Sequence, residues 1–406
     1  MNKILNKLLS DLSNCTGCGA CAQACKIGCI KIIEDENLAL KPTILSEKCI
    51  ECGMCIKSCP IKNKSMLNHP SSYAYCYIPN VSNSVSSSGG VFYEIAKSII
   101  SNKGYVCASV YSEKLQVINF VSNKETDILR MCGSKYVYSN TGNAFIEISR
   151  LLNSGQEVLY CSTPCQVAGL KQYLNAHQIN QDRLYLIDLF CAGCPSQGLF
   201  DLYIEWLQIK KHKQIVKYVF RDKELGWDRL VARIDYLDSS REYIEHLNDD
   251  PYYSSFISRK TLKDSCYSCY YTSLYRCGDL SIGDLWGANK MINVDEISKK
   301  LGISAVLINT QKGEELFGLL KTTGRVCKVD VTDVCKYNFS IVRPATKHKN
   351  NNYIFESLRT KGFQKTASRY MYETYGLKRL LMPYIPQWLK ITLHGIKKHF
   401  SFANKQ

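Results

Sequence analysis

Cysteine is the residue type that gives this chain its chemistry, because 21 of its 406 residues are cysteine. Two runs near the N-terminus share the spacing C-x2-C-x2-C-x3-C, namely CTGCGACAQAC over residues 15–25 and CIECGMCIKSC over residues 49–59. Thiolates on tight loops at this spacing can surround the corners of an iron–sulfur cubane. The internal repeat therefore predicts two iron–sulfur clusters rather than one.

The spacing matches that of two-cluster bacterial ferredoxins, in which the fourth cysteine of each run binds the other cluster. Three glycines, Gly17, Gly19 and Gly53, let the backbone approach the cluster closely, and residues 29–42 suit two short strands between the runs. Zinc is the alternative, although zinc usually takes two separated pairs rather than two runs of four. The extra thiol of Cys29 is interpreted as a small buried hydrophobe, with a surrogate ligand as its alternative. The expected ligand sets are Cys15, Cys18, Cys21 and Cys59 for one 4Fe–4S cluster, and Cys49, Cys52, Cys55 and Cys25 for the other.

Composition places this cysteine chemistry in a folded protein. Apolar residues make up 45% and charged residues 22% of the chain, which predicts a globular protein of two or three domains. A disulfide framework is typical of small secreted domains, and neither a signal peptide nor an apolar run of membrane-spanning length is visible. We therefore expect a cytoplasmic protein whose cysteines serve metal or redox chemistry. The net charge of +16 suits anionic cofactors and partners, and no nucleic-acid module is recognisable.

A serine- and glycine-rich stretch, NVSNSVSSSGG over residues 80–90, is expected to separate the N-terminal unit from the rest of the chain. It runs into a helical pattern over residues 91–104, which is expected to end at Gly104. Residues 86–90 would present free N–H groups and hydroxyls at the start of this helix, an arrangement suited to a phosphate or pyrophosphate. An ordinary helix cap on a surface loop is the alternative.

Further along, alternating residues predict a hairpin from strands at 105–111 and 115–121. Strand–helix units are predicted at 157–175, 184–208 and 304–321. Such units favour a parallel or mixed sheet, whose ligands lie at the carboxyl ends of the strands.

The first two units bring Cys165 and Cys191 to that edge of the sheet. With the pair Cys266 and Cys269 they complete the four thiolates that a third 4Fe–4S cluster needs. Competing ligands are Cys161, which is expected to point from its strand into packing, Cys194 and Cys277. The alternative is that all seven of these cysteines are structural thiols.

An ordered set of motifs then makes the chain resemble the coenzyme F420 hydrogenase/dehydrogenase beta-subunit family, in its bacterial form with a fused two-cluster ferredoxin. The motifs are SSGGVF (87–92), GSKYVYS (133–139), STPCQVAGLK (162–171), CAGCPS (191–196), FRDKELGW (220–227) and CYSCYYTSLYRCGDLSIGDLWG (266–287). Members of this family are iron–sulfur flavoproteins that bind FAD and a 4Fe–4S cluster in the body domain. Some of them act on a deazaflavin, coenzyme F420.

The resemblance implies that Cys165, Cys191, Cys266 and Cys269 bind the third cluster. Two departures from the family pattern, Cys194 before Pro–Ser and Cys277 beside a position that is often not a thiol, keep these two as competitors. The implied flavin contacts are Ser87, Ser88, Gly89, Gly90, Arg130, Ser134, Lys135, Thr163, Gln166, Arg221 and Lys223. Basic residues among them would tune the electronics of the flavin.

Residues 364–406 are strongly basic, with Glu373 as their single acidic residue. We expect a C-terminal helix that docks on the body with a solvated basic face. Peripheral contact with an anionic membrane surface is the alternative.

The sequence thus predicts an α+β or α/β protein with a two-cluster ferredoxin domain (1–66), a mixed-sheet flavin-binding body (67–360) and a basic amphipathic tail (361–406). Its expected function is that of an iron–sulfur, flavin-dependent oxidoreductase. It would pass electrons between a one-electron carrier, such as ferredoxin or another redox subunit, and a small-molecule substrate. The alternatives are a non-enzymatic electron-transfer subunit that feeds a partner enzyme, and a structural or regulatory iron–sulfur protein held at the membrane by its tail. No catalytic side chain is predicted, because the seven histidines lack ligand spacing and no GxGxxG or Walker motif is present.

Overall fold

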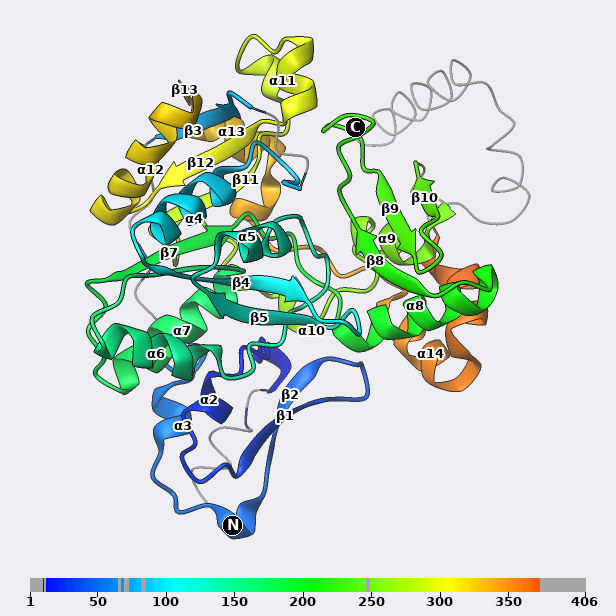
Figure 1. Cartoon of the computed structure of the whole chain (residues 1–406). Helices are drawn as coiled ribbons and strands as arrows, with labels where there is room; N and C mark the ends of the chain where they lie inside the picture. Colours follow the sequence, from blue (N-terminus) through cyan, green and yellow to red (C-terminus); the bar gives the residue numbers. More distant parts are fainter. Residues whose placement is uncertain are drawn as a thin grey trace, which may run out of the picture.

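The computed structural model describes residues 10, 12–64, 67–68, 73–81, 85–245 and 249–372. Figure 1 shows a small N-terminal unit below a large mixed sheet, with a three-stranded sheet beside it. The strands are β1 (Ile30–Glu34), β2 (Leu40–Ile44), β3 (Ala74–Pro79), β4 (Tyr105–Tyr111), β5 (Val117–Ser122), β6 (Val158–Ser162), β7 (Leu184–Leu189), β8 (Ile215–Val219), β9 (Ala232–Tyr236), β10 (Arg241–Ile244), β11 (Leu280–Asp284), β12 (Ser304–Ile308) and β13 (Gly324–Val329). The α-helices are α2 (Ala20–Gln23), α3 (Met54–Lys57), α4 (Val91–Ser101), α5 (Glu125–Met131), α6 (Ala144–Asn153), α7 (Pro164–Ala176), α8 (Gln197–Lys211), α9 (Pro251–Ile257), α10 (Asp264–Tyr267), α11 (Glu296–Leu301), α12 (Gln311–Thr323), α13 (Val331–Tyr337) and α14 (Asn351–Thr366).

The N-terminal unit repeats one local structure twice. Each cysteine run leads into a four-residue helix, α2 or α3, whose N-cap glycine is left-handed: Gly19 has φ 77° and Gly53 has φ 73°. A side chain disfavours this conformation, so glycine at these two positions is required by the turn. The predicted strands between the runs form the antiparallel hairpin β1–β2, as expected.

The large sheet has eight strands in the order β13-β3-β12-β11-β7-β6-β4-β5, which confirms the predicted mixed sheet. Its four middle strands, β11, β7, β6 and β4, are parallel, and antiparallel strands flank them on both sides. Successive residues of a strand face opposite sides of a sheet. In β6, Leu159 and Cys161 accordingly pack against α4, α5 and α12, whereas Val158 and Tyr160 pack against α6 and α7. The packing expected of Cys161 is confirmed.

Two expectations about the serine- and glycine-rich stretch need correction. Strand β3 comes before the stretch and already pairs with β12 and β13, so residues 80–90 connect two elements of the body rather than separate it from the N-terminal unit. The helix after the stretch ends at Ser101, and Lys103, not Gly104, takes the left-handed conformation, with φ 65°. Gly104 is needed for space, because a Cβ there would lie 2.7 Å from Cγ2 of Ile99.

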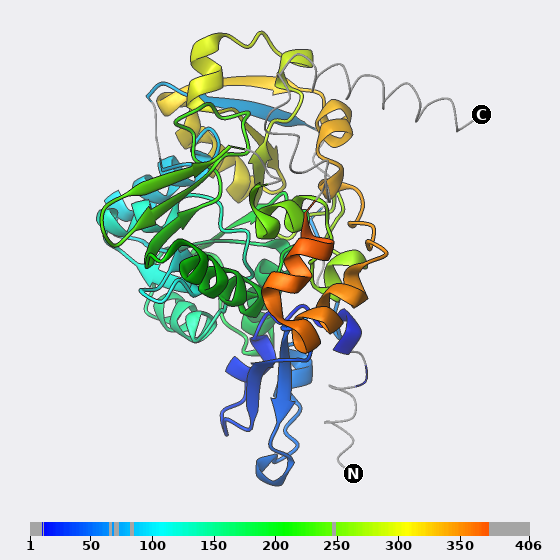
Figure 2. The same ribbon diagram turned by 90° about the vertical axis from the view of Figure 1, so that its right-hand side faces the viewer.

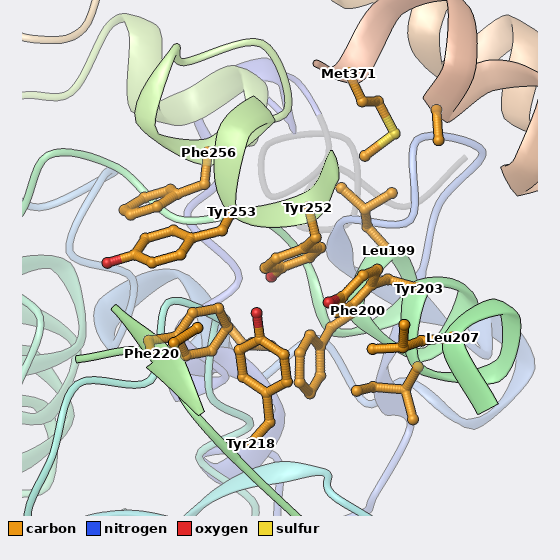
Figure 3. Packing of buried hydrophobic residues seen from close by; sticks show 14 of the residues in the cluster. Leu199, Phe200, Tyr203, Leu207, Tyr218, Phe220, Tyr252, Tyr253, Phe256 and Met371 are labelled. Atoms are coloured by element: carbon orange, nitrogen blue, oxygen red, sulfur yellow. The ribbon is translucent and has the colours of Figure 1, made fainter. Parts of the chain in front are cut away.

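A second core lies under the three-stranded antiparallel sheet β10-β9-β8. Figure 3 shows aromatic rings from α8, β8 and α9 packed face to edge, with Met371 at their rim. Asp250 is buried among them and accepts hydrogen bonds from the hydroxyls of Tyr203 and Tyr218. Burial raises the pKa of Asp250, and these hydrogen bonds oppose the rise.

The expected boundary at residue 360 falls inside α14, which kinks at Gly362 (φ 74°). Beyond the kink, Phe363, Ala367 and Met371 pack into this second core, so the body extends at least to Tyr372. Figure 2 shows α14 lying against the body. The rest of the predicted basic tail, from residue 373 onward, lies outside the described residues.

One disulfide joins Cys76 of β3 to Cys327 of β13. The two residues stand directly opposite each other in the antiparallel pair, with their Cα atoms 5.3 Å apart. The general expectation that the cysteines serve metal or redox chemistry rather than disulfides therefore does not hold for this pair, whose partners are 251 positions apart in the chain. In the part of the chain that the structure describes, no helix has the length and apolar character needed to cross a membrane.

Candidate functional site

The first expected ligand set lines one hollow, the inner N-terminal hollow, together with apolar side chains of the N-terminal unit. Its four thiols are those of Cys15, Cys18, Cys21 and Cys59. Burial raises the pKa of Cys18 to about 12, and the neighbouring thiolates add to the rise. Buried thiols that raise each other's pKa become thiolates readily only next to a multivalent cation, so this donor set fits an iron–sulfur core.

The second expected set, Cys25, Cys49, Cys52 and Cys55, lies at the outer end of the unit. Burial raises the pKa of Cys55 to about 11, with further contributions from the other three thiolates of the set. The side chain of Cys52 is exposed to solvent. The buried Cys29 places its Sγ 3.3 Å from Sγ of Cys25, so it contacts an expected ligand as well as apolar side chains.

The N-terminal unit is packed against the body through the inner set. Cys18 shares a hydrophobic core with α6 and α7. The hydroxyl of Thr141 donates to the backbone carbonyl of Cys18 over 2.9 Å. Gly169 of α7 allows this approach, because a Cβ there would lie 3.0 Å from both Cβ and Sγ of Cys18.

Another hollow lies where α7, the loop after β7 and the segment around α10 meet. We call it the third hollow, because its cysteines are the ones considered for a third cluster. Of the seven cysteines considered for a third cluster, Cys161 and Cys277 do not line it. The five that do are Cys165, Cys191, Cys194, Cys266 and Cys269. Burial raises the pKa of Cys269 to about 12, and the thiolates of Cys165 and Cys266 contribute. The structure thus brings together the four thiols implied by the family resemblance and one competitor, Cys194.

Two buried hydroxyls support a sulfur-rich occupant of the third hollow. Thr16 and Tyr271 both line it, and neither Oγ1 of Thr16 nor the hydroxyl of Tyr271 has a hydrogen-bond partner in the structure. A buried hydroxyl without a partner is costly, and cluster or cysteine sulfur can accept from it. Among the described residues no three His, Cys, Asp or Glu side chains converge on one metal ion, whereas the four cysteines of a 4Fe–4S cluster each bind a different iron.

Buried cations form part of the wall of the third hollow. Arg276 is 1% exposed and is paired with Asp188, which is fully buried in β7. Asp188 also accepts from the backbone N–H groups of Cys277 and Gly278, over 3.0 and 2.8 Å. These bonds hold the chain after Cys269 against the carboxyl end of β7. Sequence reasoning did not single out either member of this pair.

The serine- and glycine-rich stretch lines a cavity of about 220 Å³, the serine–glycine cavity. The cavity lies at the carboxyl ends of the parallel strands, where Ser162, Leu189 and Asp284 border it. It also includes Val91 and Phe92, at the N-terminus of α4, where helix N–H groups are open to an anion.

The hydroxyls and N–H groups of this stretch are less free than expected. The hydroxyl of Ser88 donates to the carbonyl of Ile303, and the N–H of Gly89 donates to Oγ of Ser304. The hydroxyl of Ser87 accepts from the N–H of Ser134. These bonds hold the stretch against β12 and the 133–135 loop, which leaves the N–H groups at the start of α4 as the part of the expected anion site that can still donate to a ligand.

The other expected flavin contacts fall into two groups. Ser134, Lys135 and Thr163 line the serine–glycine cavity. Lys135 donates to the carbonyls of Met131, Cys132 and Gly133, and burial lowers its pKa to about 8. Lys223 donates to the carbonyls of Ser88 and Leu301 behind the loop, and burial likewise lowers its pKa to about 8.

Five of the expected contacts do not line the serine–glycine cavity: Gly89 and Lys223, described above, and Gln166, Arg221 and Arg130. Gln166 is fully buried, and its amide oxygen accepts from Ser139. Arg221 is buried behind the wall in an ion pair with Asp284, and Arg130 is exposed and paired with Asp127. The structure thus gives Gln166 and Arg221 supporting roles instead of the direct contacts that were expected.

Asp284 is a site residue that sequence reasoning missed, although it lies within the quoted motif GDLWG. It borders the serine–glycine cavity, and its two carboxylate oxygens accept from Arg221 (2.8 Å) and from Nε1 of Trp227 (2.7 Å). Trp227 stacks on Trp286 with ring centroids 5.5 Å apart. A carboxylate fixed in this way can accept hydrogen bonds from N–H or hydroxyl groups of a ligand.

The serine–glycine cavity shares residues 132–135 with a broad cleft of about 1280 Å³ between the 133–135 loop, β8 and α11. Lys135 and Lys223 line it, and further basic residues are interspersed with carboxylates: Arg130, Lys217, Arg229, Arg233, Lys299 and Lys300 with Glu113, Asp222, Glu224, Asp228 and Glu296. A space of this size can accommodate a small molecule beside the serine–glycine cavity.

Known proteins share both parts of this architecture. Residues 14–63 match the 4Fe–4S dicluster domain, and residues 155–340 match the C terminus of the coenzyme F420 hydrogenase/dehydrogenase beta subunit. An uncharacterized protein of Methanocaldococcus jannaschii is 22% identical over 357 residues, which cover 78% of this chain and 89% of that protein. A chain in a structure of the F420-reducing NiFe hydrogenase complex from Methanosarcina barkeri aligns with a TM-score of 0.46 and 14% identity, over 72% of this chain and 94% of that chain. The dicluster match favours iron–sulfur clusters over zinc in the N-terminal unit. The chain thus joins an N-terminal 4Fe–4S dicluster domain to a domain of the coenzyme F420 hydrogenase/dehydrogenase beta-subunit family.

Proposed function

We propose that this chain is an iron–sulfur flavoprotein oxidoreductase that connects a one-electron carrier protein with a small-molecule substrate. The observation that carries the proposal is that neighbouring hollows share lining residues. Thr16 lines both the inner N-terminal hollow and the third hollow, and Thr163 and Cys194 line both the third hollow and the serine–glycine cavity. Residues 132–135 then line both that cavity and the broad cleft.

The proposed ligands of the third cluster are Cys165, Cys191, Cys266 and Cys269. Cys194 is left out because it also lines the serine–glycine cavity and so stands between the two sites. When bound, the clusters supply one-electron transfer, and FAD supplies the exchange between one- and two-electron chemistry. The family match adds weight, because residues 155–340 include all four of these cysteines.

The residues around the serine–glycine cavity give each side of a bound flavin a partner of suitable charge. The start of α4 would hold phosphate oxygens, since helix N–H groups there are free to donate. Lys135 would keep a positive charge at the border between cavity and cleft, because three backbone carbonyls hold its ammonium group in place. Asp284 would accept from N–H or hydroxyl groups on the opposite side.

Single electrons would enter this series of neighbouring sites at the outer cysteine set of the N-terminal unit. Cys52 is exposed there, whereas the thiols of Cys18 and Cys21 are buried. The side chains of Ile27 and Ile50 near the outer set are 49% and 66% exposed, so a partner protein can cover them. Ferredoxin or another redox subunit would suit this end, and the substrate would enter through the broad cleft, with coenzyme F420 as one candidate.

The test is the amount of iron, acid-labile sulfide and released flavin per chain in anaerobically purified protein. The proposal predicts about 12 iron atoms, since each 4Fe–4S cluster holds four, and one flavin. About eight iron atoms without flavin would overturn it and would leave a non-enzymatic electron-transfer subunit. Flavin with about eight iron atoms would refute the third cluster alone.

A further inference from the structure

Two groups occupy the partition between the inner N-terminal hollow and the third hollow. Thr16 lies on the first cysteine loop, is 7% exposed and lines both hollows. Lys263 comes three positions before Cys266, is 6% exposed and lines the third hollow. Its Nζ donates to the backbone carbonyl of Thr16 over 2.7 Å. A side chain of the body thus holds the cluster-binding loop of the N-terminal unit directly.

The positive charge of Lys263 is not neutralised by a carboxylate in the described part of the chain. Its Nζ rests on the ring of Tyr138 and on the Thr16 carbonyl. The other buried cation of this wall, Arg276, is instead paired with the buried Asp188, and Arg343, which also lines the hollow, is exposed. The charge of Lys263 is therefore available to an anionic occupant of the third hollow, such as a 4Fe–4S core on four thiolates.

The backbone of Lys263 fixes this position. Its carbonyl accepts from the N–H of Cys266 (2.9 Å), and its own N–H donates to the carbonyl of Cys194 (3.3 Å). Lys263 is in this way tied to two of the three cysteine-bearing segments of the third hollow, the loop after β7 and the segment around α10, while its side chain reaches across to the N-terminal unit.

We propose that Lys263 is a positioning residue that raises the reduction potential of the third cluster and holds the inner cluster loop beside it. The inference rests on the proposed function, since it requires a third cluster. Reduction adds one negative charge next to a buried cation that has no carboxylate partner among the described residues, and an opposite charge stabilises the reduced form. Removing one buried charge changes such a one-electron equilibrium by about tenfold or more, which corresponds to about 59 mV.

The experiment is a redox titration of the full-length, anaerobically purified protein, followed by electron paramagnetic resonance. The signal of the third cluster is identified as the one lost in Cys191→Ser. Lys263→Gln is compared with Lys260→Gln, a matched control three residues away. Lys260 is also buried, at 4% exposure, and donates to the carbonyl of Tyr372 over 2.7 Å, but it does not line the third hollow.

Lys263→Gln should make the third cluster harder to reduce by about 59 mV or more, with iron content unchanged, whereas Lys260→Gln and Lys263→Arg should keep the wild-type potential. Equal potentials in Lys263→Gln and Lys260→Gln would overturn the inference. If Lys263→Gln loses the third cluster, the potential of that cluster in Lys263→Arg becomes the test. A lower potential in Lys263→Arg, with the iron content retained, would also overturn the inference. An iron count of about eight in the wild-type protein would refute the third cluster itself, which separates that failure from this one.

Discussion

The buried ion pair between Asp188 and Arg276 offers a quantitative test of how the wall of the third hollow is built. Both side chains are at most 1% exposed. Asp188 accepts from Nε of Arg276 (3.1 Å) and from the N–H groups of Cys277 and Gly278. Asp188→Asn keeps the size of the side chain but leaves the guanidinium without a counter-charge and turns an amide NH2 toward these donors.

Removing one partner of a buried ion pair costs about 3–5 kcal/mol, because the remaining charge is left uncompensated. We therefore expect Asp188→Asn to lower the free energy of unfolding by that amount. The entropy of unfolding is about 2.1 cal/mol/K per residue, so each kcal/mol shifts the Tm of a body of about 300 residues by about 1.6 °C, and the expected loss is about 5–8 °C. The measurement is thermal unfolding of the anaerobic holoprotein, followed by circular dichroism at one fixed scan rate.

Asp264→Asn is the matched control, because Asp264 pairs with Lys347 over 2.7 Å while both side chains are more than 40% exposed. Exposed pairs contribute less than about 1 kcal/mol, so this variant should lose less than about 2 °C. If Asp188→Asn loses no more stability than Asp264→Asn, the ion pair does not support the wall in the way described.

Further predictions concern the ligands, the flavin and the contact between the two units. Cys191→Ser should lower the iron content from about 12 to about eight atoms per chain. Cys277 lies outside the third hollow, so Cys277→Ser should leave the iron content unchanged. Equal iron contents in the two variants would contradict the ligand assignment. Raising the pH from about 7 to about 9 should weaken flavin binding, because Lys135 and Lys223, whose pKa values burial lowers to about 8, lose their positive charge over this interval. The fluorescence of the released flavin measures this loss of binding. Lys135→Met should bind flavin more weakly at neutral pH, and its flavin binding should depend less on pH. If flavin binding by the wild-type protein does not change with pH, these charges have no role in it. Gly169→Val should place the new side chain against Cys18, lower the free energy of unfolding by about 1–3 kcal/mol and reduce the iron bound by the inner set. Gly318→Ala on α12 is the control, and it should be neutral or slightly stabilising because the space around Gly318 is open. Full iron content and wild-type stability in Gly169→Val would show that the two units pack less tightly than the structure indicates.

The strand–helix units and the cysteine runs were readable from the chain because local patterns specify them. The alternating residues of β4 and β5 and the helical period of α4 follow from which faces must be buried. The disulfide between Cys76 and Cys327 was not readable, because only the pairing of β3 with β13 brings two residues 251 positions apart into contact. The expected boundary of the body at residue 360 missed part of this core for a similar reason, since burial of Phe363 and Met371 depends on residues that are distant in the sequence.

The candidate site divides in the same way. The cysteine spacing by itself indicated that the N-terminal unit binds iron–sulfur clusters, because three of the four expected ligands of each cubane lie on one short loop and the fourth comes from the repeat of the same run. The choice among seven cysteines for a third cluster depended on the tertiary structure, which leaves Cys161 in strand packing and Cys277 in the core while five others line one hollow. The placement of Thr16 and Lys263 between two hollows also required the fold. The side chain of Lys263 can donate to the backbone carbonyl of Thr16, 247 positions away, only after the N-terminal unit packs on the body, and no local pattern records that contact.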